Sequence, residues 1–168
     1  MMRLVTSTFG ELMSTDNDLE ARAAIEHALL LYTRGIDRLD PALLAAAFHS
    51  EAVLEGYGPK ERRVEAFAPF AVKSLRQAYR ATQHRLSNTF VQFDGGDAAD
   101  VETYVVADHF HTVGDTEVID TFAGRYIDRF ERRDGGWAIV KRSLRCDWTR
   151  RDNVSAHMPG EFIDSPRG

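Results

Sequence analysis

Four side chains of this sequence make up an acid–base set that can remove a proton from carbon. Tyr32 and Asp37 stand five residues apart in the segment YTRGID. His84 and Arg145 follow much later in the chain. A neutral histidine, whose ordinary pKa is about 6.5, can act as the base, and a carboxylate can fix its tautomer. A phenol can protonate a leaving hydroxyl or support an enolate, and a guanidinium adds a permanent positive charge. None of these steps requires a metal or an organic cofactor, so we expect the protein to use none.

Each of the four side chains also has a purely structural interpretation. Tyr32, at helical spacing from other apolar residues, fits a core position, and Asp37 fits a turn or a cap. His84 fits an exposed position at the end of a helix. Arg145 fits a solvated strand position, paired with Asp147. These interpretations are independent of one another, whereas a single acid–base site accounts for all four positions, and this favours the functional interpretation.

The first half of the chain is predicted to be helical. Asp16 or Asn17 can cap a helix whose apolar residues recur at spacings of four, four and three, and Gly35 ends or bends that helix. Asp40 followed by Pro41 predicts the start of a second helix. Helices are predicted over residues 16–35, 41–49 and 64–81, and a short strand is predicted over residues 52–58.

The second half of the chain is predicted to be strand. After His84 the hydrophobic pattern alternates with a period of two up to Phe93, and glycine-rich turns separate three further strands. Gly124 inside a strand indicates a bulge, which helps a wide sheet to curve. These further strands cover residues 100–113, 118–133 and 137–150. Helices followed by an antiparallel meander predict an α+β fold, in which a curved sheet wraps around the long first helix as a cone with an apolar pocket.

The composition limits the class of protein. A chain of 168 residues with 43% hydrophobic content is long enough for one compact domain and short for two. A formal charge of −5 argues against nucleic acid as a partner, because nucleic-acid-binding proteins usually carry a basic stripe. The single cysteine, Cys146, excludes an intrachain disulfide and fits a reducing compartment.

The ends of the chain carry no pattern typical of targeting. The N-terminus lacks the apolar core of a signal peptide, and the longest apolar run, residues 42–48, is too short to cross a bilayer. We therefore expect a cytoplasmic protein with no membrane partner. The predicted organisation is a disordered extension over residues 1–15, with Met13 as an alternative start, one domain over 16–152, and an irregular tail over 153–168.

The order of the predicted elements and the motif YTRGID resemble a known family. Both are similar to the SnoaL-like branch of the nuclear transport factor 2-like superfamily, over about residues 18–150. That branch includes bile acid 7α-dehydratase, scytalone dehydratase and hexachlorocyclohexane dehydrochlorinase. The spacing of Tyr32 and Asp37 resembles the Tyr-x4-Asp motif of the bile acid enzyme. The dehydrochlorinases carry lysine in place of Tyr32, so the resemblance does not favour chlorinated substrates.

The resemblance also implies roles for residues of the second half. His84 stands where members of this branch carry the catalytic histidine. Arg145 matches an arginine on the last strand of the bile acid enzyme, and Asp108 falls near its third-strand aspartate. Scytalone dehydratase uses a strand histidine in this region, and Asp108 and its neighbour His109 must point to opposite faces of a strand. The choice between Asp108 and His109 as the residue that faces the pocket therefore stays open.

The predicted function is a cofactor-independent lyase that eliminates water from a hydrophobic, cyclic hydroxy-ketone. One alternative is an isomerase or cyclase that uses the same proton-transfer set. Another is a non-catalytic domain that binds a small molecule, and a third is an assembly partner similar to the small subunit of ring-hydroxylating oxygenases. We also expect a homo-oligomer, a trimer or a dimer, because the outer face of such a sheet must be covered.

Overall fold

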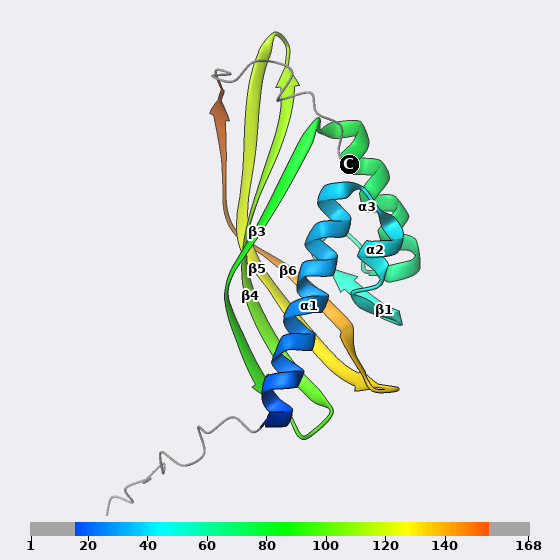
Figure 1. The fold of residues 1–168 in the computed structure, drawn as a ribbon. Coiled ribbons are helices and arrows are strands. Elements are labelled where there is room, and N and C mark those ends of the chain that lie inside the picture. The colour runs from blue at the N-terminus through cyan, green and yellow to red at the C-terminus, as the bar shows by residue number, and fades with distance from the viewer. Residues whose placement is uncertain (1–15, 155–168) are drawn as a thin grey trace, which may run out of the picture.

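The computed structural model describes residues 16–154 (Figure 1). The predicted extension over residues 1–15 and all but the start of the predicted tail lie outside the described residues. None of the helices in the described range is long and apolar enough to span a membrane. The helices are α1 (Asp16–Arg38), α2 (Pro41–Ala45) and α3 (Val64–Ala78). The strands are β1 (Phe48–Glu55), β2 (Arg62–Arg63), β3 (Ala81–Phe93), β4 (Ala98–Val113), β5 (Thr116–Arg133) and β6 (Gly136–Asn153).

The strands form one curved, unclosed sheet in the order β2-β1-β6-β5-β4-β3. The four long strands β3 to β6 are antiparallel neighbours, as the alternating pattern predicts. Strand β1 pairs with β6 in parallel, a pairing that the sequence did not predict. The helices lie on one side of the sheet, with α1 running along its hollow (Figure 1). The predicted α+β fold, a curved sheet around the long first helix, is confirmed.

Helix α1 packs against the sheet along one apolar stripe. Ile25, Leu29, Tyr32 and Ile36 recur at spacings of four, three and four, and all are buried. This spacing places them on one face of the helix, so each turn of α1 contributes a side chain to the core. Full burial of such a side chain contributes about 1.5–3 kcal/mol to folding. The position of the helix is therefore fixed by its packing.

Gly35 lies within α1 and does not end it. The helix continues to Arg38, which corrects the predicted end of this helix. Gly35 is needed for close packing against α2, because a Cβ atom at this position would collide with the backbone of Leu44. The predicted start of α2 is confirmed, since the carboxylate of Asp40 accepts hydrogen bonds from two backbone N–H groups of the first turn at 2.9 and 3.0 Å.

The predicted bulge is present where β5 pairs with β6. Ala123 is opposite Trp148 and Gly124 is opposite Cys146, so Asp147 is an extra residue in β6. A Cβ atom at Gly124 would collide with the backbone of β6. The extra residue shifts the alternation of side chains. Just before the bulge the even-numbered residues Arg142 and Leu144 face the helices, and beyond it the odd-numbered residues Thr149 and Arg151 do.

The contact between Gly35 and Leu44 predicts the effect of a single methyl group. We expect Gly35→Ala to lower the free energy of unfolding by about 1–3 kcal/mol, because either α1 or α2 must move. Chemical denaturation measures this change. Gly96→Ala is the control, because nothing lies within 4 Å of a Cβ atom there, and it should stay within about 0.5 kcal/mol of the wild type. Equal stability of the two variants would contradict this account of Gly35.

Candidate active site

A cavity of about 670 Å³ lies between the helices and the hollow face of the sheet. Helices α1 and α3 line one side, and strands β3 to β6 line the other. Most of the surface that lines it is apolar, with contributions from Ile36, Phe67, Leu75, Phe122 and Leu144. An apolar cavity of this size fits a ring-containing small molecule, and the few polar groups in its wall fix where chemistry can occur.

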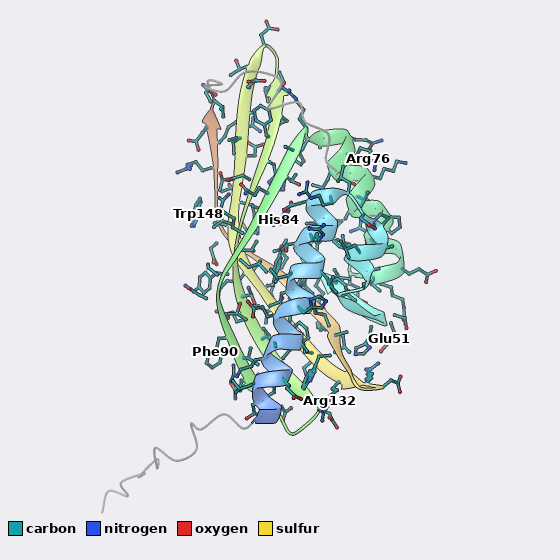
Figure 2. The ribbon with its side chains drawn as sticks, in the orientation of Figure 1. Glu51, Arg76, His84, Phe90, Arg132 and Trp148 are labelled. Carbon is teal, nitrogen blue, oxygen red and sulfur yellow. The ribbon has the colours of Figure 1, made fainter. Side chains whose placement is uncertain are left out.

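His84 and Asp37 form a hydrogen-bonded pair at the wall of this cavity. His84 lies in β3 and lines the cavity, between the sheet and α1 (Figure 2). Its Nδ1 atom is 2.7 Å from Oδ1 of Asp37, near the end of α1. The backbone N–H of His84 donates to Oδ2 of Asp37 at 2.9 Å, and the Thr82 hydroxyl donates to Oδ1 at 3.0 Å. The predicted pairing of His84 and Asp37 is therefore present in the structure.

The pairing determines the tautomer of His84. A carboxylate can only accept, so Nδ1 of His84 carries a proton, and in the neutral ring the free lone pair is on Nε2, on the other side of the ring. Partial burial alone would raise the pKa of the Asp37 carboxyl, but its hydrogen bonds to His84 and Thr82 outweigh this and hold the pKa below its usual value. Asp37 is therefore ionised at neutral pH, and the imidazole is oriented as a base.

His109, and not Asp108, faces the cavity beside His84. The two imidazole rings meet edge to face with their centroids 5.8 Å apart. The Nδ1 atom of His109 is 3.2 Å from the backbone carbonyl oxygen of Asp120, which can only accept, so Nε2 of His109 also has a free lone pair. Burial, followed by the nearby His84, lowers the pKa of His109 and favours its neutral form.

Asp108 lies on the opposite face of the sheet. Its carboxylate accepts hydrogen bonds from Arg85 at 2.8 Å and from the hydroxyl of Thr121 at 2.7 Å. The expectation that Asp108 belongs to the site is therefore wrong. Neighbouring side chains of a strand point to opposite faces, and of these two it is His109 that lines the cavity.

Two tyrosine hydroxyl groups form a second polar feature of the cavity wall. The hydroxyl oxygens of Tyr32 and Tyr57 are 3.0 Å apart, and both residues line the cavity. Burial raises the pKa of both phenols, so both are protonated at neutral pH. The sequence did not predict this role of Tyr57. Glycines on both sides of it, Gly56 and Gly58, both with positive φ, were the available signal of an unusual turn.

Arg145 does not reach the cavity. It is exposed and lies opposite Arg125 on the face of the sheet turned away from the helices. Its neighbour Leu144 lines the cavity, so strand alternation directs Arg145 outward. The expectation that Arg145 faces the cavity is therefore wrong, and the arginine buried on the helix side is Arg142. The spacing of two between Arg142 and the apolar Leu144 was the signal for this assignment.

An acidic and a basic side chain, Asp120 and Arg151, line the cavity near the hairpin of β4 and β5. Asp120 is 2.9 Å from Nε2 of His111 and accepts two hydrogen bonds from Arg151 at 2.5 and 2.6 Å. The hydrogen bond from Arg151 lowers the pKa of Asp120 to about 2. Among residues 16–154, no group of three or more His, Cys, Asp or Glu side chains is arranged to hold a metal ion.

Comparison with known proteins identifies the family. Residues 17–143 match the SnoaL-like domain family. The chain belongs to this family. It lies within the nuclear transport factor 2-like superfamily, so the predicted resemblance is confirmed. No curated protein matches the chain.

Solved structures share the fold of this SnoaL-like chain. A provisionally named scytalone dehydratase from Novosphingobium aromaticivorans is 26% identical, with a TM-score of 0.71 over 84% of this chain and 93% of that one. The hexachlorocyclohexane dehydrochlorinase LinA-type3 from Novosphingobium barchaimii is 21% identical, with a TM-score of 0.74 over 85% and 97%. A provisionally named aromatic ring hydroxylase from Novosphingobium aromaticivorans is 22% identical, with a TM-score of 0.68 over 81% and 94%.

The hydrogen bonds of Asp37 predict a pH dependence of stability in the SnoaL-like chain. At neutral pH, Asp37→Asn should lower the free energy of unfolding by about 1.5–3 kcal/mol, because it removes a charged acceptor. The pKa of Asp37 is lowered from 3.8 on folding, so its contribution is complete above about pH 4 and is lost as the pH falls through the lower folded value. Denaturant titrations from pH 7 to pH 3 should therefore show the two proteins converging.

The control for this measurement is Asp115→Asn, which changes an exposed carboxylate in the turn between β4 and β5. It should follow the wild type at every pH. A stability difference for Asp37→Asn that stays constant down to pH 3 would contradict the assigned ionisation of Asp37.

Proposed function

We propose that this SnoaL-like protein is a cofactor-independent lyase that eliminates water from a hydrophobic, cyclic hydroxy-ketone. The observation that carries the proposal is the His84–Asp37 pair, which presents the free Nε2 atom of a fixed imidazole at an apolar cavity. Dehydratase-type and dehydrochlorinase-type proteins among the structural relatives are consistent with elimination chemistry. The cavity volume and its apolar wall support a ring-containing substrate.

The proposed reaction begins at a carbon next to the ketone. Nε2 of His84 takes the proton, and the electron pair of the C–H bond moves onto the carbonyl oxygen as an enolate. The hydroxyl pair of Tyr32 and Tyr57 donates a hydrogen bond to this oxygen, through the proton that is not shared between the two phenols. The enolate then re-forms the ketone, the C–O bond at the neighbouring carbon breaks, and the imidazolium returns its proton to the leaving hydroxyl. The products are a conjugated ketone and water, so protons balance.

Asp37 serves this reaction by stabilising the imidazolium of His84 and by fixing its tautomer. Exclusion of water strengthens both effects, because charges interact more strongly in an apolar cavity. Asp108 and Arg145 take no part in the proposal, since both lie on the opposite face of the sheet.

An isomerase is the second proposed function, and His109 is the observation that favours it. His109 lies beside His84 and has a free lone pair on Nε2, so it can take the proton from the imidazolium of His84 and deliver it to a different carbon of the same enolate. Isomerisation moves the double bond without loss of water, so the mass of the product separates it from elimination.

We also propose that copies of this chain assemble through the outer face of the sheet. Phe90, Tyr104, Ile127 and Trp148 are exposed there, on four neighbouring strands. Figure 2 shows Phe90 and Trp148 pointing away from the helices. Large exposed apolar patches of this kind mark interaction surfaces. The same face carries charges of both signs, such as Arg125, so a second copy can meet it with opposite charges.

The proposed base predicts a selective loss of turnover. Against a panel of cyclic hydroxy-ketones, His84→Ala should lower kcat by about 10²–10⁴-fold, because proton abstraction loses its base. Asp37→Asn should lower kcat while leaving the cavity intact, because the imidazole loses its tautomer. Loss of water is followed by mass spectrometry, and the conjugated ketone by its absorbance. The control is His27→Ala, which removes an exposed imidazole of α1 and should leave turnover unchanged.

The outcome also separates catalysis from simple binding. A binding domain would bind the panel compounds and release them unchanged, and His84→Ala would bind them equally well. Wild-type turnover in both His84→Ala and Asp37→Asn would contradict the proposed mechanism. Turnover without a change of mass would replace elimination by isomerisation.

The outer face predicts the oligomeric state of a charge variant. Trp148, which is 51% exposed, should be buried between copies, so Trp148→Glu should shift the mass in light scattering towards the monomer. Leu30→Glu changes an exposed leucine of α1 on the helix side and should leave the assembly intact. A monomeric wild type, or an unchanged mass in Trp148→Glu, would contradict assembly through this face.

A further inference from the structure

A buried ion pair lies beneath the two tyrosine hydroxyls, and the proposed reaction does not use it. Asp128 of β5 and Arg142 of β6 are opposite one another in the sheet. The carboxylate accepts a hydrogen bond from Nε of Arg142 at 2.8 Å and one from Nη2 at 2.6 Å. Neither side chain exposes any surface. Burial of two charges is costly, and removal of one partner would leave the other charge buried and unpaired.

The guanidinium of Arg142 is in contact with aromatic rings of the cavity wall. Its Cζ atom lies 4.2 Å from the ring centroid of Tyr32 and 4.0 Å from that of Tyr126. Phe48 lies on a further side at 5.6 Å. The Nη1 atom of Arg142 is buried and has no hydrogen-bond partner among the described residues. The positive charge therefore acts directly on the phenols next to it, and Asp128 is the carboxylate that balances it.

An unbalanced cation at this position would change the state of the phenols. A positive charge nearby stabilises phenolate and lowers the pKa of a tyrosine, whereas burial raises it. Burial raises the pKa of Tyr32, Tyr57 and Tyr126, and Arg142 acts in the opposite direction on all three. Asp128 also opposes Arg142, since its charge raises the pKa of Tyr126, so without Asp128 burial alone would oppose the guanidinium.

We propose that Asp128 is a positioning residue for the hydroxyl pair: by neutralising Arg142 it keeps Tyr32 and Tyr57 protonated, so that both remain hydrogen-bond donors. A phenolate cannot donate, and its charge would repel a developing enolate. The effect on catalysis rests on the proposed lyase function, whereas the effect on the charge of the phenols does not. Asp128 acts through Arg142 and does not line the cavity.

Other titratable or charged groups face the same cavity, and the substitutions below leave them in place. They are Tyr79, His84, His109, Asp120, Arg150 and Arg151.

The first test is a tyrosinate titration of the protein without substrate. In Asp128→Asn, at least one phenol should ionise about one to two pH units lower than in the wild type, measured by near-ultraviolet absorbance. Adding Tyr32→Phe to this variant should remove all or part of the shifted signal. The matched control is Asp100→Asn, which breaks an exposed pair with Arg129 and should titrate as the wild type does.

The second test restores neutrality in a different way. The double variant Asp128→Asn, Arg142→Gln carries no charge at the pair, and two amides can hydrogen-bond there, so its phenols should titrate as in the wild type. Asp128→Ser, which leaves room for a water on Arg142, should reproduce the shift if Asp128→Asn does not fold. The proposal would be overturned if the phenols of both Asp128→Asn and Asp128→Ser ionise at the same pH as in the wild type. It would also be overturned if the phenols of the folded double variant ionise at a lower pH than in the wild type.

Kinetics separates this proposal from the proposed function. With an accepted hydroxy-ketone, Asp128→Asn should lose kcat at a lower alkaline pH than the wild type, and the double variant should recover the wild-type profile. If the phenols of Asp128→Asn ionise at a lower pH but the wild type eliminates water from no hydroxy-ketone, only the lyase function is overturned. Elimination by the wild type with an unshifted titration in Asp128→Asn would overturn the role of Asp128 alone.

Discussion

The carboxylate of Asp37 joins the first helix to β3, at the edge of the sheet. Strand β3 is an edge strand, and its neighbour on the open side is α1 rather than another strand. Three hydrogen bonds, two from His84 and one from Thr82, fasten the end of α1 to this edge. The same contacts that orient the imidazole hold α1 against this edge of the sheet. Any movement of α1 relative to β3 therefore changes the geometry of the base as well as the shape of the cavity.

The packing of α1 makes this contact rigid. The helix is held by its buried stripe and by the close approach of Gly35 to α2, so Asp37 is presented on a helix that cannot easily slide. The ion pair of Asp128 and Arg142 lies under the middle of this stripe, where aromatic rings surround the guanidinium. Polar groups in the core are thus arranged in two places, one at the edge of the sheet and one below the phenols, with apolar packing between them.

The sequence predicts most of the fold because its signals are local. Alternation after His84 and the glycine-rich turns define the long strands, and Asp40 with its proline defines the start of α2. The parallel pairing of β1 with β6 depends on contacts between distant segments, so no local pattern announces it. Gly35 was misjudged for the same reason, since its requirement comes from the close approach of α2 and not from the helix itself.

The site was predicted in part. Tyr32, Asp37 and His84 come together as the helical and strand patterns indicate. Arg145 was placed on the wrong face, and Asp108 and His109 were left as alternatives, because a resemblance gives the approximate position on a strand but not its parity. The hydroxyl of Tyr57 enters the cavity from an irregular loop, where no periodicity indicates the direction of a side chain.

The bulge in β6 has a consequence for the space inside the cone. With Asp147 as the extra residue, Thr149 lies opposite Phe122 at the cavity wall, and Trp148 lies on the outer face. In a regular strand of the same sequence, Trp148 would take the place opposite Phe122, and its indole would point into the cavity. One extra residue thus decides which side chain of β6 is presented to the cavity, a hydroxyl-bearing threonine or a bulky indole.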